Sequence, residues 1–352
     1  MKPLKVKNLE DLNSWVKRLI GSYRVFAPVR VGHYDEFRPV DRTGAINWSF
    51  VNTRLSPKNL FHPHSERMFE FSLDPEDPNR NILVEAAKDI SPRVIVGIRP
   101  CDAYAMKIMD VNFDTPEYKD PWWVERRSLT CLIGLACSVP CSTCFCKATG
   151  SGPFDPRGLD VLISPCGDGY IIEAVSEKGR DLLERFPAGG EVASEKDLSE
   201  RDRIREEAEK HINTIGDLKA LAERPVLDFF NAPMWEDVQF ACINCGVCTF
   251  LCPTCWCFDI QDEVYGKKGC RFRIWDSCMF PLFTLHGSGH NPRSQKLQRV
   301  RQRFMHKLKY YVDKYGLGIA CVGCGRCVQF CPVNIDIREV IRLMVSQCEC
   351  PV

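Results

Sequence analysis

The first half of the chain combines one helical apolar pattern with several strand-like blocks. In residues 8–20 the apolar positions recur every three or four residues behind an Asn that can cap a helix, so we predict a helix there. Segments 23–31, 45–52 and 92–98 are rich in Val, Ile and aromatic residues between Pro, Gly and Asp, a pattern typical of strands. Residues 159–175 predict two more strands joined by a Gly-Asp-Gly turn.

The second half is dominated by helical patterns. Residues 176–223 are dense in Glu, Lys, Arg and Ala with sparse apolar positions, which predicts solvated helices and a domain boundary. Residues 294–315 form another helical pattern with a basic face, and the apolar spacing in residues 335–344 predicts a closing helix. We therefore expect an α+β protein with an N-terminal mixed α/β domain (1–175), a charged helical spacer (176–230) and a C-terminal domain (231–352).

Composition narrows the class of protein without identifying it. The chain has 352 residues, 45% of them hydrophobic, and its 47 Lys and Arg against 46 Asp and Glu give a net charge of +1. This balance implies no bulk attraction to nucleic acid or membranes. The longest apolar stretches are strand-sized and no N-terminal segment has the layout of a secretion signal, so we expect a cytoplasmic protein without a membrane span.

Cysteine is the unusual residue, with 21 copies in clusters too dense for the disulfide framework of a large protein. Thiols kept for metal indicate a reducing compartment. The spacing C-x2-C-x2-C-x3-C-P occurs twice, over residues 242–253 and 321–332, and it matches the ligand run of two-cluster ferredoxins. Gly246 and Gly325 permit the tight curl that lets the sulfurs of one loop converge. Zinc sites or disulfides are the alternative, but zinc usually takes two CxxC pairs separated by a longer loop.

The fourth cysteine of each run lies too far along the chain for its own loop's cluster, and in two-cluster proteins it ligates the other one. We therefore predict two [4Fe–4S] clusters with crossed ligation. The first takes Cys242, Cys245, Cys248 and Cys331, and the second takes Cys252, Cys321, Cys324 and Cys327.

A long insertion separates the two runs, whereas small bacterial ferredoxins join them by short strands. We interpret this insertion as mostly helical. In this respect the C-terminal domain resembles the α-helical ferredoxin domains of the heterodisulfide reductase C subunit and of succinate dehydrogenase iron–sulfur subunits. The resemblance implies helices that carry the two motifs and hold the clusters side by side.

Motifs spread over most of the chain carry a more specific resemblance. They are GIRPCDAYAMKIMD (97–110), TCFC (143–146), CPTCWCFDIQDE (252–263), WDSC (275–278), SGHNPR (288–293) and CVGCGRC (321–327). Together they resemble the β subunit of soluble sulfhydrogenases, the A subunit of anaerobic sulfite reductase and related iron–sulfur subunits next to heterodisulfide reductases. The resemblance implies an electron relay. One partner would be an FAD subunit that exchanges electrons with NAD(P)H, and the other a catalytic hydrogenase, sulfite reductase or heterodisulfide reductase subunit.

The same resemblance singles out cysteines of the N-terminal domain. In the sulfhydrogenase relatives, cysteines match Cys101, Cys137, Cys144 and Cys146, whereas Cys141 has no counterpart. Four thiolates are a complete set for a third [4Fe–4S] cluster, and Cys141 could substitute for one of them. The alternative is a group of buried or locally reactive thiols, since Cys is often buried.

Cys255, Cys257 and Cys278 form a further candidate site within the insertion. Their CxC pair repeats the layout of the TCFC run, which indicates similar use, but only three thiolates match the family. An incompletely thiolate-bound cluster could offer an iron to a ligand, and a set of apolar core cysteines is the alternative. Candidates for a fourth ligand are Cys270, Asp276, His286 and His290.

The remaining patterns favour a relay over an enzyme. No GxGxxG run lies between a strand and a helix, so the chain has no flavin or dinucleotide fingerprint, and no nucleophile–base constellation is evident. The basic positions of residues 293–309 could dock an acidic partner or offset the charge of nearby clusters, with a solvated helix face as the alternative. We expect a multi-cluster electron-transfer subunit of a cytoplasmic anaerobic redox complex. The alternative is a stand-alone reductase of sulfite, polysulfide or a disulfide that uses the Cys255 region.

Overall fold

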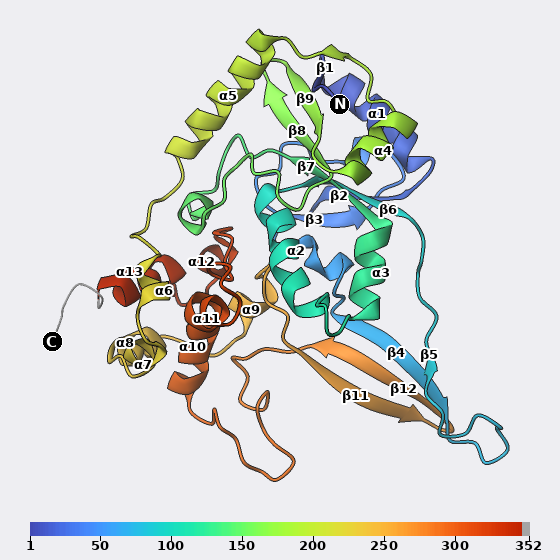
Figure 1. Ribbon diagram of the computed structural model, residues 1–352. Helices are drawn as coiled ribbons and strands as arrows, with labels where there is room; N and C mark the ends of the chain where they lie inside the picture. Colours follow the sequence, from blue (N-terminus) through green and yellow to red (C-terminus); the bar gives the residue numbers. More distant parts are fainter. Residues whose placement is uncertain (347–352) are drawn as a thin grey trace.

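A computed structural model describes residues 1–346 and shows two β-sheets, the helices that cover them and a C-terminal region of helices and loops (Figure 1). The larger sheet has eight strands in the order β10-β1-β9-β8-β7-β6-β2-β3. Its members are β1 (Leu4–Val6), β2 (Arg24–Val31), β3 (Tyr34–Pro39), β6 (Arg93–Ile98), β7 (Thr130–Leu135), β8 (Val161–Cys166), β9 (Gly169–Ala174) and β10 (Glu191–Val192). The central strands β2, β6, β7 and β8 are parallel to one another, and the remaining pairs are antiparallel.

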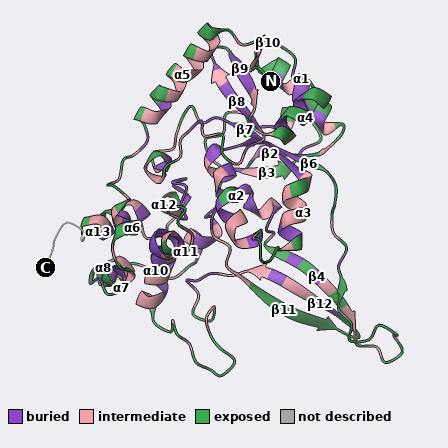
Figure 2. Cartoon of the chain, viewed as in Figure 1, coloured by how far each residue is buried: buried purple, intermediate pink, exposed green. Residues whose placement is uncertain are grey.

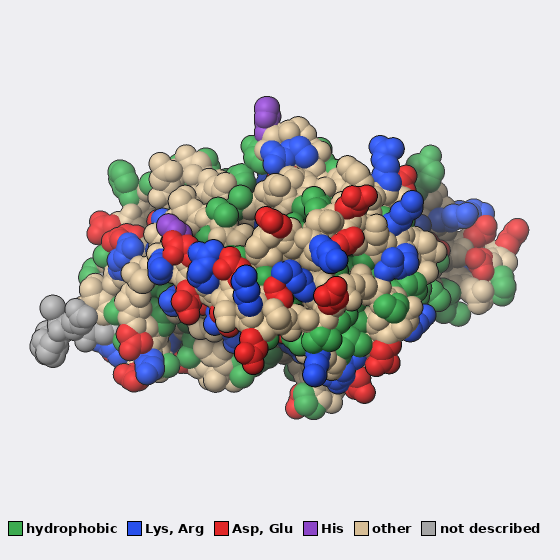
Figure 3. Space-filling view, turned by 90° about the horizontal axis from the view of Figure 1, so that it is seen from above, with side chains coloured by type: hydrophobic (Ala, Val, Ile, Leu, Met, Phe, Trp, Pro, Cys, Tyr) green, Lys and Arg blue, Asp and Glu red, His purple; other side chains and the backbone are tan. Residues whose placement is uncertain are grey.

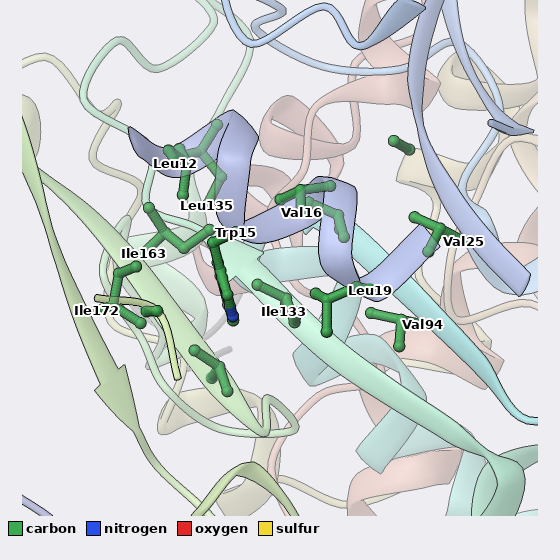
Figure 4. Packing of buried hydrophobic residues seen from close by; sticks show 14 of the residues in the cluster. Leu12, Trp15, Val16, Leu19, Val25, Val94, Ile133, Leu135, Ile163 and Ile172 are labelled. Atoms are coloured by element: carbon green, nitrogen blue, oxygen red, sulfur yellow. The ribbon is translucent and has the colours of Figure 1, made fainter. Parts of the chain in front are cut away.

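Both faces of this sheet are covered, as expected for parallel strands, which are usually buried on both sides. Side chains alternate along β6, so that Val94 packs into one core and Ile95 into the other. Helix α1 (Leu9–Ile20) covers the first face, where Trp15 contacts the strands (Figure 4), together with α4 (Glu177–Arg185). Helices α2 (Pro100–Phe113) and α3 (Pro121–Leu129) cover the second face.

Most of the predicted elements of the first half are confirmed. Helix α1 begins after Asn8, whose side chain accepts a hydrogen bond from the backbone N–H of Asp11. The strands predicted at 23–31 and 92–98 are β2 and β6, and the hairpin of residues 159–175 is β8 and β9.

The strand predicted at 45–52 is wrong. The chain forms a 3-10 turn at Thr43–Ala45 and then an irregular segment, although its Ile46 and Phe50 side chains are buried in the core. Within this segment the side chain of Asn47 accepts from the Ser49 N–H and donates to Asp35. Such local side-chain bonds compete with sheet pairing for the backbone, so the apolar residues reach the core from a loop.

The smaller sheet joins the two halves of the chain. Its strands β4 (Ser65–Ser72) and β5 (Val84–Glu85) come from the first half, and β11 (Phe258–Tyr265) and β12 (Lys268–Trp275) come from the insertion, in the order β11-β12-β4-β5. The expectation of a mostly helical insertion is therefore wrong for this segment. Two residues, Gly266 and Lys267, connect Tyr265 to its partner Lys268, and the φ of +61° at Gly266 suits such a tight hairpin turn.

The predicted helices of the second half are present. Residues 176–223 contain α4, α5 (Glu195–Lys210) and α6 (Ala220–Glu223), with the short strand β10 between the first two. The pattern of residues 294–315 is a continuous rod of α10 (Lys296–Met305), a π-helical turn (His306–Tyr310) and α11 (Tyr311–Tyr315). The closing helix is α13 (Ile337–Ser346). The other helical segments are α7 (Val226–Phe230), α8 (Met234–Phe240), α9 (Val247–Phe250), α12 (Arg326–Gln329) and the 3-10 turns Pro57–Leu60 and Cys146–Thr149.

The surface is mixed in character. Helix α5 and strand β11 are largely exposed, whereas the central strands are buried (Figure 2). Acidic and basic side chains intermingle on the face seen in Figure 3, in keeping with the net charge of +1. None of the helices in residues 1–346 is long and apolar enough to cross a membrane.

Candidate metal centres

The four cysteines of the first predicted cluster line one cavity of about 540 Å³. Cys242 and Cys245 lie on the loop that leads into α9, Cys248 lies within α9, and Cys331 follows α12. Two of these sulfurs accept backbone hydrogen bonds, Cys242 from the Asn244 N–H at 3.4 Å and Cys331 from the Ile335 N–H at 3.2 Å. Backbone donors aimed at sulfur stabilise a thiolate, so this donor set fits a cluster that needs four anionic ligands.

The four cysteines of the second predicted cluster line a neighbouring cavity of about 290 Å³. Cys252 comes from the first run and Cys321, Cys324 and Cys327 from the second, so the cavities combine the two runs in the crossed manner that the spacing predicts. The geometry thus brings both predicted sets together, and their role as cluster ligands stays a prediction.

A third cavity of about 400 Å³ is lined by Cys101, Cys137, Cys144 and Cys146, and also by Cys141. Cys101 lies in the first turn of α2, just after β6, and burial together with the neighbouring Asp102 carboxylate raises the pKa of its thiol. The others lie on the loop that follows β7. All five thiols reach the same space, so the geometry leaves open which four would ligate a cluster.

The three cavities form a row. The first and second share the wall residues Cys327, Arg303 and Ile337, and the second and third share Cys324. The loops that line the second and third cavities are also in direct contact, because the Phe145 N–H donates to the Gly323 carbonyl at 2.9 Å.

Glycine is required where these two loops meet. Gly323 has a φ of +62°, and a Cβ at this position would lie 2.4 Å from the backbone nitrogen of Cys146. Gly325, with a φ of +74°, would place a Cβ 2.3 Å from the Thr143 hydroxyl oxygen. Any side chain here would separate the loops, so the contact between the second and third cavities depends on these two residues.

A buried ion pair joins the second cysteine run to helix α2. Arg326 lies between two cysteines of the second run and Asp102 directly follows Cys101, and both side chains are fully buried. The guanidinium donates to both carboxylate oxygens of Asp102 at 2.7 Å and to the Thr53 carbonyl at 2.8 Å. Its Nη2 also donates to the Asn52 side-chain oxygen at 2.6 Å. Sequence reasoning missed this pair, and the only signal was a charged residue inside each ligand motif.

The basic face of the 294–315 helix is mostly buried, and it does not form the solvated surface considered as the alternative. Four of its cations are buried, at exposed fractions from 2% to 9%: Arg299, Arg303, Lys307 and Lys309. Two of them line cavities. Arg303 contributes to the walls of the first and second, and Lys307 to the wall of the second.

Nearby thiols determine the charge state of these two cations. Burial alone lowers the pKa of Arg303, but the thiolates of Cys255, Cys248 and Cys252 outweigh it, and the pKa is well above its ordinary value. Burial likewise lowers the pKa of Lys307, but Cys252, Cys255 and Cys321 raise it above the ordinary value. Both side chains are therefore cationic.

The candidate group within the insertion, formed by Cys255, Cys257 and Cys278, is also assembled. Cys257 and Cys278 are within hydrogen-bond distance, and this bond lowers the pKa of Cys257 to about 7. Cys255 is hydrogen-bonded to Cys252. The buried amino group of Lys58 donates to the Cys255 carbonyl at 2.7 Å, and burial lowers its pKa to about 8. These thiols lie together, and their use as a further cluster site stays a prediction.

The proposed fourth ligands of that group are mostly distant from it. Cys270 lies on β12 opposite Glu263, toward the turn of the hairpin. His286 and His290 are exposed and contact each other, with ring centroids 5.3 Å apart. Asp276 lies nearest, because its N–H donates to the Cys257 carbonyl at 3.0 Å. Within residues 1–346, no three His, Cys, Asp or Glu side chains converge in a way that would hold a single metal ion.

Comparison with known proteins identifies the family of this chain. Residues 241–335 match the family model of a 4Fe–4S dicluster domain, a range that includes all eight cysteines of the first two cavities. Sulfhydrogenase 2 subunit beta of Pyrococcus furiosus is 31% identical over 321 residues, which cover 90% of this chain and 91% of that protein. The cysteine-lined cavities therefore belong to an iron–sulfur electron-transfer subunit, and the chain is a member of the sulfhydrogenase β-subunit family.

Proposed function

We propose that this chain relays single electrons through three [4Fe–4S] clusters. The donor would be a flavin subunit linked to NAD(P)H, and the acceptor a catalytic hydrogenase, sulfite reductase or heterodisulfide reductase-type subunit, with flow in either direction. The observation that carries the proposal is the row of three cavities, each lined by a complete set of cysteines and each sharing wall residues with the next. The relationship to a sulfhydrogenase subunit supports the hydrogenase-type partner.

In this proposal cluster 1 is held by Cys242, Cys245, Cys248 and Cys331, cluster 2 by Cys252, Cys321, Cys324 and Cys327, and cluster 3 by Cys101, Cys137, Cys144 and Cys146. Each cluster supplies a centre that gains and loses one electron. The chain supplies the thiolates, the backbone N–H groups that hydrogen-bond to sulfur and the contacts that fix the order of the row.

Both ends of the row approach the surface, as a relay between two partners requires. At the first cavity Cys245 is exposed and its neighbour Ile243 is 62% exposed. At the third cavity Val139, between Cys137 and Cys141, is 66% exposed. The second cavity is lined by the buried cysteines Cys252, Cys321 and Cys324, together with Cys327. Electrons would therefore enter at one end of the row and leave at the other.

The test is cluster counting on anaerobically purified variants, by iron and acid-labile sulfide analysis with EPR of the reduced state. The wild-type chain should hold about twelve iron atoms, four for each cluster. C245S, C324S and C101S should each lose about four of them, from clusters 1, 2 and 3 in turn. C166S is the matched control, since Cys166 is buried but lines none of these cavities.

Two further outcomes decide the details of the proposal. C141S should keep the full iron content and C144S should lose one cluster, and the reverse result would give Cys141 the ligand role. If C101S kept the iron content of the wild-type chain, cluster 3 would be removed from the relay. Reconstitution with the flavin and catalytic subunits should show that the cysteine variants stop coupled electron transfer while C166S sustains it.

A further inference from the structure

The side chain of Arg303 is a buried cation in the wall shared by the first two cavities. It is 3% exposed, and it lines the cavities of both predicted clusters. One of its terminal nitrogens donates to the Cys248 carbonyl at 3.0 Å, while its Nε has no hydrogen-bond partner. Throughout residues 1–346 no carboxylate lies within ion-pair distance of Arg303 or of Lys307.

A buried cation without an acidic partner is costly, and proteins normally pair such a group with a carboxylate. The same helix shows this, because the buried Lys309 pairs with Asp313 at 2.8 Å. The nearby Arg326 likewise pairs with Asp102. Arg303 and Lys307 instead line the cysteine-lined cavities, so negative charge in those cavities would compensate them.

The helix geometry places the side chains of Arg303 and Lys307 on the same side, beside the cysteine-lined cavities. Residues 303 and 307 are four positions apart, so they lie on the same side of the rod, and the π-helical turn His306–Tyr310 begins between them. The amino group of Lys307 donates to the Thr254 hydroxyl and to the Ala320 carbonyl. These partners anchor Lys307 at the second cavity alone, whereas Arg303 reaches both cavities.

We propose that Arg303 raises the potentials of both clusters 1 and 2, by placing one positive charge between two centres that become more negative on reduction. Lys307 does the same for cluster 2 alone. The inference rests on the proposed function, since it needs both clusters. Both residues act on the clusters through their charge and are positioning residues, with no contact to a substrate. Without the shared cation, an electron would be held less well on either cluster.

The experiment is an EPR-monitored redox titration of R303Q, R303K and K307Q in the full-length chain, with iron and sulfide content measured on every sample. R303Q should lower the midpoint potentials of clusters 1 and 2 and leave cluster 3 unchanged. We expect at least a tenfold fall in the ratio of reduced to oxidised cluster at a fixed ambient potential, which equals about 59 mV for one electron. R303K should restore most of this shift, and K307Q should lower cluster 2 alone.

Arg301 provides the matched control. It lies on the same helix, lines neither cavity and stacks on the Phe230 ring at 3.5 Å, so R301Q should leave all three potentials unchanged. Wild-type potentials in an R303Q protein with full iron content would overturn the inference while leaving the relay intact. A wild-type chain without clusters 1 and 2 would overturn the proposed function instead. If R303Q loses iron, K307Q still tests the effect of a buried cation, because Lys307 lines the second cavity alone and an unchanged potential of cluster 2 would overturn the inference.

Discussion

The buried pair of Asp102 and Arg326 offers a direct test of what joins the two halves of the chain. D102N keeps the shape of the side chain but removes its charge and turns one acceptor into a donor that faces the guanidinium. The substitution leaves Arg326, which is fully buried, without its carboxylate. Breaking a buried ion pair on one side costs about 3–5 kcal/mol of folding free energy, because the remaining charge stays buried and uncompensated.

The surroundings of the pair indicate where in this range each variant should fall. Three further acceptors remain for Arg326, two on Thr53 and one on Asn52, and the thiolate of Cys324 adds to the negative charge beside it. The cost of D102N should therefore lie near the lower limit, at about 3 kcal/mol. R326Q should cost more, about 5 kcal/mol, because Asp102 is then left without its cation beside two anionic sites.

Anaerobic urea unfolding, followed by far-UV circular dichroism and by cluster absorbance, measures these effects. With a urea m-value of about 3 kcal/mol per molar, D102N should unfold about 1 M earlier than the wild type. The control is E200Q, which removes one partner of the exposed Glu200–Arg203 pair and should leave the midpoint unchanged. The double variant D102N/R326Q should cost less than the sum of the single variants. A D102N midpoint equal to those of the wild type and the control would refute the reasoning.

Three other outcomes are expected. G323A should lose cluster 2 or cluster 3 in iron analysis, because its Cβ would meet the Cys146 backbone. The control G32A, at a similar φ of +58° with open space around it, should keep full iron content. Equal iron content in the two variants would contradict the role of Gly323. Burial lowers the pKa of His306 to about 4, so the free energy of unfolding should fall by about 3 kcal/mol as the pH drops from 6.5 to 4. In the same urea titration, the free energy of unfolding of H306Q should depend less on pH. The isolated chain should accept electrons from a reduced viologen dye without reducing sulfite, polysulfide or a disulfide, and turnover of any of these would favour a reductase instead.

The cysteine sets could be predicted because their information is local. Fixed spacing within each run predicts three ligands, and the same spacing predicts that the fourth ligand comes from the other run. The cavities combine Cys252 with the second run and Cys331 with the first, as that reasoning requires. The assembly of Cys101 with the 137–146 loop came from a family resemblance, since no local spacing links residues on two different connections.

The features that escaped prediction depend on contacts between distant parts of the chain. Asp102 and Arg326 are 224 positions apart, so no local pattern relates them. The β12 strand pairs with β4 across nearly 200 residues, and a helical interpretation of the insertion had no way to include that partner. The sequence left open whether the basic face that includes Arg303 docks a partner, offsets the charge of nearby clusters or is solvated, because the helix pattern alone does not reveal the cavities beside it.

The crossed arrangement of cysteines has a consequence for how the protein is made. The first cavity is complete only when Cys331 has joined Cys242, Cys245 and Cys248, which lie at least 83 positions before it. With the ligand sets proposed here, the first cysteine run cannot complete cluster 1 before the second run has been synthesised. Assembly of the two clusters is then tied to the folding of the second run onto the first.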